Sequence, residues 1–138
     1  MNKAIQKRRR ESGQSVVEFA LTLPLVLLLI CGMIEMGWMA STRQVLDSLT
    51  REGARAGMVA TTKTASTTAV NTRITKMKPS YLTKPLNVTI TYSNPSSFKD
   101  GDISVNITYD LPPLTPITSF LAPGGVFHMN STCTMKMS

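Results

Sequence analysis

The longest apolar run in the 138-residue sequence constrains its fold more than any other feature. Residues 19–34, FALTLPLVLLLICGMI, contain no charged side chain, and apolar character extends over residues 16–40 with Glu18 and Glu35 as the only charges. A helix rises about 1.5 Å per residue, so the stretch from Glu18 to Glu35 covers roughly 26 Å, close to the ~30 Å hydrocarbon thickness of a bilayer. The segment therefore predicts one membrane-spanning helix with a carboxylate near each interface.

Positive charge is concentrated ahead of this helix. The chain carries a net charge of +7, and residues 1–13, with five basic side chains and one acidic, contribute +4 of it. The cluster in this tail consists of Lys7, Arg8, Arg9 and Arg10. The positive-inside bias places the N-terminus in the cytoplasm and residues 41–138 outside. A basic run also suits nucleic acid, but a topology signal ahead of an apolar span is far commoner, and the near-balanced charge of the remaining chain gives no basic stripe for DNA.

Three kinds of processing suit a basic tail followed by an apolar run. An ordinary secretory signal needs a small-x-small cleavage site after the apolar core. In a site that ends at Ala40, the first of the two small positions is occupied by Trp38, which is too large. A lipoprotein signal needs a small residue before the lipidated cysteine, and Ile30 precedes Cys31. The third kind cuts on the cytoplasmic side, before the apolar core, and leaves the helix on the mature protein.

The residues around Gly13 fit the third kind. The segment KRRRESGQSVVEFALTLPLVLLL resembles a class III, type IV prepilin-like signal, with Gly13 as the last leader residue and Gln14 as the first mature one. More narrowly, GQSVVEFALTLPLVLLLICGMIEMGW followed by REGARAG resembles the TadE-like proteins of Tad/Flp pilus systems. The resemblance covers residues 8–60 well and extends more weakly to the end through the YDLPPL motif at residues 109–114.

This resemblance implies a processing site and a registration residue. A prepilin peptidase would cut between Gly13 and Gln14, where a residue without a side chain lets the backbone lie extended and close to the protease. Glu18 would then lie about 6 Å along the helix from the new amine. In the family, this glutamate meets the N-terminal amine of a neighbouring subunit, whereas the residue alone favours a snorkelling interfacial carboxylate. Whether the Gln14 amine is methylated stays open.

The helix is expected to continue outward as an amphipathic stem. Over residues 41–60, apolar side chains fall on one side, and Arg43, Asp47, Arg51 and Arg55 recur every four residues on another. Gly53 and Gly57 belong to a small-residue surface that would allow tight packing, most simply on the chain's own domain. A polar link at residues 61–68 and a short helix over residues 66–78 are predicted to follow.

Three strands follow with clear alternation, and they predict an antiparallel sheet. The apolar faces are Leu86, Val88, Ile90 and Tyr92 in the first, Ile103, Val105, Ile107 and Tyr109 in the second, and alternate residues from Phe127 to Met137 in the third. The first two strands should pair as a hairpin. Because a sheet that is apolar on one face must be covered, the stem and the short helix are its expected partners. The proline-rich stretch of residues 110–125 is long enough for either a lid on the sheet edge or a docking loop.

The sequence offers little catalytic or metal-binding chemistry. It has one histidine, His128, which the strand pattern turns toward solvent. Of its two cysteines, Cys31 lies inside the longest apolar run and Cys133 lies near the C-terminus, so an internal disulfide between them is not expected. Paired ligands with zinc spacing are absent from the sequence. We therefore expect no enzyme, no cofactor and no metal.

These observations predict an α+β, pilin-like protein with three parts: a cytoplasmic leader (1–13), a transmembrane helix with its stem (14–60) and an extracytoplasmic head (61–138). The expected function is that of a processed pseudopilin, or minor pilin, in Tad/Flp pilus assembly or initiation and surface adhesion. Its expected location is the inner membrane, with incorporation into the surface pilus left open. The implied partners are prepilin peptidase, other pilins, the Tad inner-membrane assembly platform and the lipid bilayer, without nucleic acid. The alternative is an uncleaved bitopic protein whose external head binds a partner.

Overall fold

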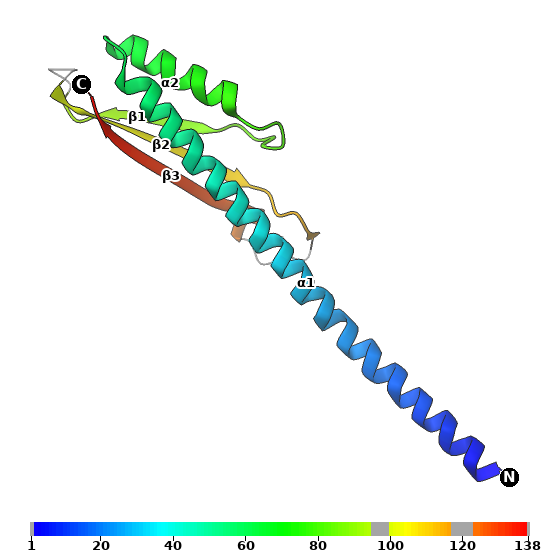
Figure 1. Ribbon diagram of the computed structural model, residues 1–138. Helices are drawn as coiled ribbons and strands as arrows, with labels where there is room; N and C mark the ends of the chain where they lie inside the picture. The colour runs from blue at the N-terminus through cyan, green and yellow to red at the C-terminus, as the bar shows by residue number, and fades with distance from the viewer. Residues whose placement is uncertain (1, 95–99, 117–122, 138) are drawn as a thin grey trace.

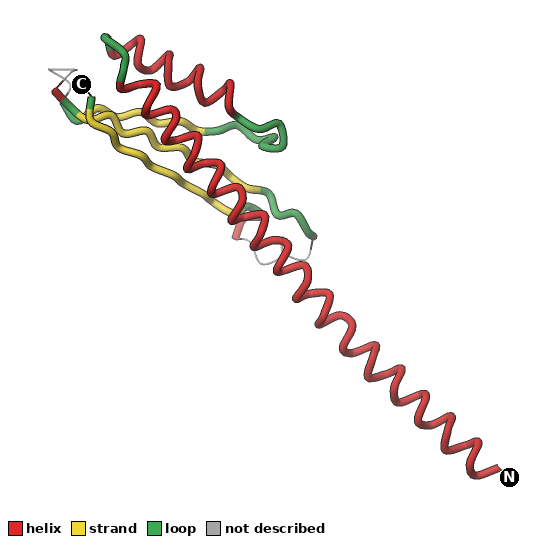
Figure 2. Tube along the Cα trace, viewed as in Figure 1, coloured by secondary structure: helices red, strands yellow, loops and turns green. Residues whose placement is uncertain are grey.

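One long helix joined to a three-stranded sheet forms the protein (Figure 1, Figure 2). The computed structural model describes residues 2–94, 100–116 and 123–137. In chain order its elements are the helices α1 (Asn2–Met58) and α2 (Lys63–Met77), the strands β1 (Asn87–Tyr92) and β2 (Asp102–Leu111), the short 3-10 turn η2 (Pro123–Gly125) and the strand β3 (Phe127–Lys136). The predicted α+β fold, with a long N-terminal helix packed on an antiparallel sheet, is confirmed.

Helix α1 has two halves with different surroundings. It comprises 57 residues, a length of about 86 Å at 1.5 Å per residue, and it continues through Pro24 without ending. Every residue from Gly13 to Ile30 is exposed, and in Figure 1 this half projects away from the rest of the protein. The half that follows Glu35 packs against the head, so that one continuous rod joins the apolar segment to the sheet.

Helix α2 begins earlier than the sequence predicts. The helix expected over residues 66–78 starts at Lys63, because Thr62 caps it: the Thr62 hydroxyl accepts a hydrogen bond from the Ala65 amide at 3.3 Å. Ser66, expected in a polar link, is buried, and its hydroxyl donates to the Gly57 carbonyl at 2.9 Å. The link is therefore confined to the few residues between α1 and α2.

The sheet is a simple antiparallel meander in the order β1-β2-β3. Val105 in the central strand lies opposite Ile90 of β1 and Cys133 of β3. Burial alternates along all three strands, and the inward residues of β2 are completely covered. The predicted pairing of β1 with β2 and the predicted apolar faces are thus confirmed, while residues 95–99 of their connection lie outside the described residues.

The core lies between the apolar face of the sheet and the two helices. Its buried side chains come from α1 (Leu46, Leu49 and Ala54), α2 (Val70 and Ile74), the segment after α2 (Leu82), β2 (Ile103, Val105, Ile107, Tyr109 and Leu111) and the residue after β3 (Met137). Because α1 supplies part of this core, the stem is an integral part of the head. The cover predicted for the sheet, stem plus short helix, is what the structure has.

Small residues in α1 allow this close packing. A Cβ atom added to Gly57 would lie 2.5 Å from Ile103 Cδ1 and 2.7 Å from Val70 Cγ2. At Gly53 the nearest atom would be Ile74 Cδ1, at 3.1 Å. The small-residue surface of the stem therefore meets α2 and β2 of its own domain.

The face of the sheet that is turned away from α1 (Figure 1) carries the alternate polar residues of the strands. Asn106 Nδ2 donates to Thr132 Oγ1 at 2.6 Å, and the hydroxyls of Ser104 and Thr134 are hydrogen-bonded to each other. These cross-strand contacts link β2 to β3 on the solvent side.

Candidate membrane anchor, processing site and head clamp

The exposed half of α1 has the properties of a membrane anchor. Within the described chain, one helix is long and apolar enough to cross a bilayer, and none of its most apolar window is buried inside the protein. A core helix of a soluble protein would be covered by other elements. The large aliphatic side chains of this half, among them Leu21, Leu25 and Leu29, are exposed instead. They need an apolar environment from outside the chain.

The predicted processing site lies within this helix. Gly13 and Gln14 are exposed, and nothing lies within 4 Å of the position that a Cβ atom would take on Gly13. Lys7 to Arg10, in the predicted leader, continue the same helix toward the N-terminus. The peptide between Gly13 and Gln14 is therefore accessible but helical, so a protease that needs an extended substrate has to unwind α1 there. Glycine makes this easier, because it lowers helix stability by about 1 kcal/mol relative to alanine.

Glu18 lies about one turn after Gln14 on the exposed half of α1. Its backbone carbonyl accepts a hydrogen bond from the Thr22 hydroxyl at 2.8 Å. No side chain that the structure describes forms an ion pair with its carboxylate. The charge thus lies at one end of an apolar surface, accessible to a group from another molecule.

Glu35, which the sequence predicts near a membrane interface, is covered by the chain's own head. Only 3% of the residue is exposed, because the segment after β2 covers it. The Leu114 amide donates to Glu35 Oε1 at 3.0 Å and to Oε2 at 3.2 Å, and the Thr115 amide donates to Oε2 at 3.3 Å. The Thr115 hydroxyl adds a contact of 3.4 Å to the same oxygen. Glu35 is therefore a buried hydrogen-bond acceptor that ties α1 to residues 112–116.

The local sequence explains why this carboxylate is needed. Strand β2 ends at Leu111, and the next two residues, Pro112 and Pro113, have no backbone N–H to donate. Leu114 and Thr115 carry the first amides beyond the sheet ladder, and a buried amide without an acceptor costs about 1–3 kcal/mol. One carboxylate accepts from both. No sequence pattern signals this pairing, because 79 residues separate Glu35 from Leu114.

A second polar contact joins α1 to the sheet deeper in the head. The Ser131 hydroxyl of β3 donates to Asp47 Oδ1 of α1 at 2.6 Å. Ser131 lies on the apolar face of its strand and is buried. The contact satisfies a polar group that would otherwise lie unpaired in the core.

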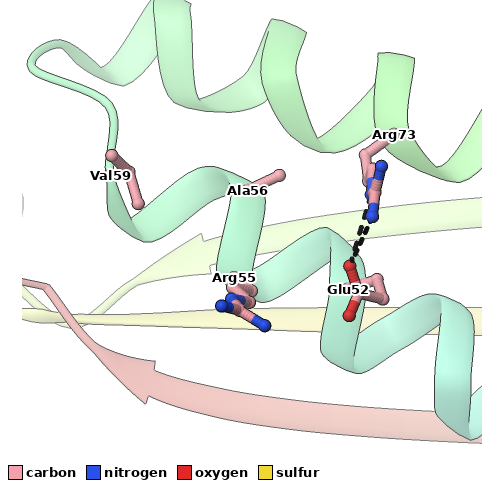
Figure 3. A pocket seen from close by; sticks show the side chains of 5 residues that line it. All are labelled: Glu52, Arg55, Ala56, Val59 and Arg73. Atoms are coloured by element: carbon pink, nitrogen blue, oxygen red, sulfur yellow. Dashed lines mark hydrogen bonds and ion pairs between the residues drawn. The ribbon is translucent and has the colours of Figure 1, made fainter.

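The two helices are linked by an ion pair beside an open hollow (Figure 3). Arg73 of α2 donates two hydrogen bonds to Glu52 Oε2 of α1, at 2.8 Å and 3.3 Å, while Arg55 extends away from this pair. The hydrogen bond from Arg73, and then the positive charges of Arg73 and Arg55, hold the pKa of Glu52 below its usual value. The hollow is lined by these three residues with Ala56 and Val59, and this set suits a structural link between helices more than a ligand site.

The single histidine takes part in a surface contact. As predicted, His128 points to solvent, and its Nδ1 lies 2.6 Å from Asp110 Oδ1 across β2 and β3. Both side chains are more than half exposed. Cys31 and Cys133 are free thiols. Among the described residues, no group of three or more histidine, cysteine, aspartate or glutamate side chains could hold a metal ion.

Comparison with known proteins gives one match. Residues 13–55 match the family model of the TadE-like proteins, which confirms the resemblance to that family over the anchor and most of the stem. The match begins at Gly13 and ends within the part of α1 that packs against α2. No curated protein and no solved structure matches the chain.

Proposed function

We propose that this chain, which is TadE-like over residues 13–55, is a structural pseudopilin of a Tad pilus system, made as a precursor and processed between Gly13 and Gln14. The observation that carries the proposal is the uncovered apolar half of α1, fixed to a head that is packed on the other half of the same helix. Such a helix is stable in a bilayer and equally stable among similar helices, which are as apolar as lipid. A subunit of this kind passes between membrane and fibre without refolding its head.

Removal of residues 1–13 changes the charge at one end of this helix. The cut takes away the tail with its net +4 and leaves a free amine at Gln14. Glu18 then lies about 6 Å from that amine along the axis. A carboxylate within an apolar surface is costly unless it meets a cation, so the charge favours one axial offset between neighbouring helices, the offset that brings the amine of one subunit to Glu18 of the next.

The basic leader supports an orientation with the N-terminus in the cytoplasm and the head outside, which fits the inner membrane. The partners that follow are prepilin peptidase, sister pilins and the inner-membrane assembly platform. The proposed role is structural: the subunit takes part in the initiation or assembly of a pilus used in surface adhesion.

Sequencing of the N-terminus tests this proposal. The protein is extracted from native membranes of cells with and without prepilin peptidase. We expect Gln14 as the first residue in the former and residues 1–13 retained in the latter. The variant Gly13→Ala should retain its leader in both, whereas Gly37→Ala, at another exposed helical glycine, should be processed normally. A leader that persists in the presence of the peptidase would instead favour an uncleaved bitopic protein whose head binds a partner.

A further inference from the structure

The segment held by Glu35 lies at the level of α1 where the exposed apolar half ends. Glu35 is the first buried side chain of α1 among those the structure describes. The helix from Glu18 to Glu35 spans roughly 26 Å, so Glu35 lies near the edge of a hydrocarbon core about 30 Å thick when the anchor is inserted. The hydrogen bonds from Leu114 and Thr115 place residues 112–116 at that same depth.

The chemistry of this level suits a lipid interface. Leu114 is 56% exposed although it is a large aliphatic residue, and Met36 beside Glu35 in the sequence is also exposed. One helical turn farther, Trp38 contacts Tyr81 with ring centroids 5.3 Å apart, and Tyr81 is partly exposed. Indole and phenol rings favour the headgroup layer, where one end of the ring is apolar and the other wet.

Glu35 itself can lie at this depth with little penalty. Its carboxylate accepts hydrogen bonds from two backbone amides and one hydroxyl, so its oxygens do not depend on water. Pro112, Pro113 and Pro116 flank Leu114 and Thr115 within this segment, and they present no N–H of their own that would have to be satisfied in lipid. Among the described residues, exposed apolar side chains thus occur both at the end of the anchor, at Met36, and in the segment of the head beside it, at Leu114.

We propose that residues 112–116 rest in the headgroup layer of the leaflet on the head side, with Leu114 inserted among the carbonyl ends of the acyl chains, and that Glu35 positions them there. The occupant of this surface is the lipid bilayer itself. The inference rests on the membrane anchor of the proposed function, and it adds a second contact between protein and lipid that fixes the depth of the head.

Quenching of single tryptophans by brominated phosphatidylcholine in nanodiscs tests the proposal. Trp38 is replaced by Phe, which keeps an aromatic ring against Tyr81, and reporters are introduced one at a time into the full chain: Leu114→Trp, Leu25→Trp and Val59→Trp. All three sites are exposed, so these substitutions leave the core intact. Leu25 lies about 15 Å along the helix from Glu35 and reports the bilayer centre, whereas Val59 lies about 36 Å beyond it and reports the far end of the head.

We expect lipid brominated near the carbonyl end to reduce the emission of the Leu114→Trp reporter by about half, and deep bromines to affect it less. The Leu25→Trp reporter should respond most to deep bromines, and the Val59→Trp reporter to neither. An unquenched Leu114→Trp reporter beside a quenched Leu25→Trp reporter would overturn the lipid contact and leave the anchor standing. A blue-shifted but unquenched Leu114→Trp reporter would mean a protein neighbour at this site, which also overturns it. Absence of quenching at Leu25 would overturn the anchor on which the proposal rests.

Discussion

A single carboxylate decides how the segment after β2 is placed. Glu35 lies in the most apolar stretch of the chain, yet it is buried by protein, with two backbone amides and one hydroxyl as donors. Hydrogen bonds to a charged acceptor are stronger than those between neutral groups. The side chain therefore does for residues 114 and 115 what a neighbouring strand does for the residues of a sheet.

Replacement of Glu35 by alanine should loosen this segment without unfolding the head. The Leu114 and Thr115 amides lose their acceptor, and at about 1.4 kcal/mol per factor of ten their hydrogen exchange should accelerate by about tenfold or more. Exchange in the core of β2 should stay unchanged. The measurement is amide exchange in micelles, with Glu18→Ala as the matched change of an exposed carboxylate on the same helix. Equal protection of residues 114 and 115 in both variants would contradict the clamp.

A second residue-scale prediction concerns Gly57. A methyl group there would come within 2.7 Å of side-chain atoms of Ile103 and Val70. Overpacking of this kind costs about 1–3 kcal/mol and outweighs the gain in helix propensity of about 1 kcal/mol. Gly57→Ala should thus lower the free energy of unfolding of the head, measured by urea titration in micelles. Gly37→Ala, with open space around it, should leave that free energy unchanged or raise it. A Gly57→Ala variant that is more stable than the parent would show that the side chains of Ile103 and Val70 rearrange to accommodate the methyl group.

At the scale of elements, the packing of α1 on α2 combines close contact with one ion pair. Because Glu52 and Arg73 are partly exposed, their contribution to stability is small and depends on salt. The lowered pKa of Glu52 still determines how this contribution to stability changes with pH. A carboxyl whose pKa is lower in the folded state stabilises the fold above its unfolded pKa, and this contribution disappears as the pH falls through the folded value.

The melting temperature should report this dependence. In the parent protein the contribution of the pair is present at neutral pH and is lost below about 4.5, the ordinary pKa of a glutamate. The variant Arg73→Met lacks it at every pH, so the difference in melting temperature between the two proteins should narrow as the solution is acidified from neutral pH to below 4.5. Arg51→Met removes an exposed charge from the same helix, away from the hydrogen bonds of the pair, and the difference in melting temperature that it causes should change less with pH. If the difference in melting temperature between the parent and Arg73→Met stays constant with pH, the ion pair contributes nothing to the stability of the head.

Most elements could be predicted from periodicity, because burial follows a local repeat. The strands alternate every second residue, as in Ile103, Val105 and Ile107, and the anchor is one uninterrupted apolar run. The start of α2 could not be predicted, since threonine and serine suit links and helix caps equally, and only the contact between Ser66 and Gly57 distinguishes the two. The Glu35 clamp could not be predicted either, because it depends on a contact between segments that are distant in the sequence.

At the scale of the whole molecule, the chain presents one charge, Glu18, on a long apolar surface that other molecules must cover. Lipid headgroups accept this charge near the interface, whereas neighbouring helices accept it only with a cation opposite. Glu18 should therefore matter for association and not for folding or processing.

The variants Glu18→Ala and Glu18→Gln test this separation. Under the proposed processing, both should be cut after Gly13 to the same extent as the parent. Both should reduce recovery with sister pilins by about tenfold, the effect of losing one charged contact of about 1.4 kcal/mol. Co-purification from native membranes and counts of pili per cell give the two readouts. Asp110→Asn, which removes an exposed charge from the head, is the control. Normal pili from Glu18→Gln would mean that side-chain size, and not charge, sets the offset between subunits.

The unbroken course of α1 from the anchor into the core leaves the protein without a joint between its two ends. Rotation of α1 about its own axis would therefore turn the β-meander and its hydroxyl-rich face with it. The rotational orientation in which each copy of α1 packs inside the membrane would consequently determine which neighbouring molecule faces the polar side of its sheet outside the membrane.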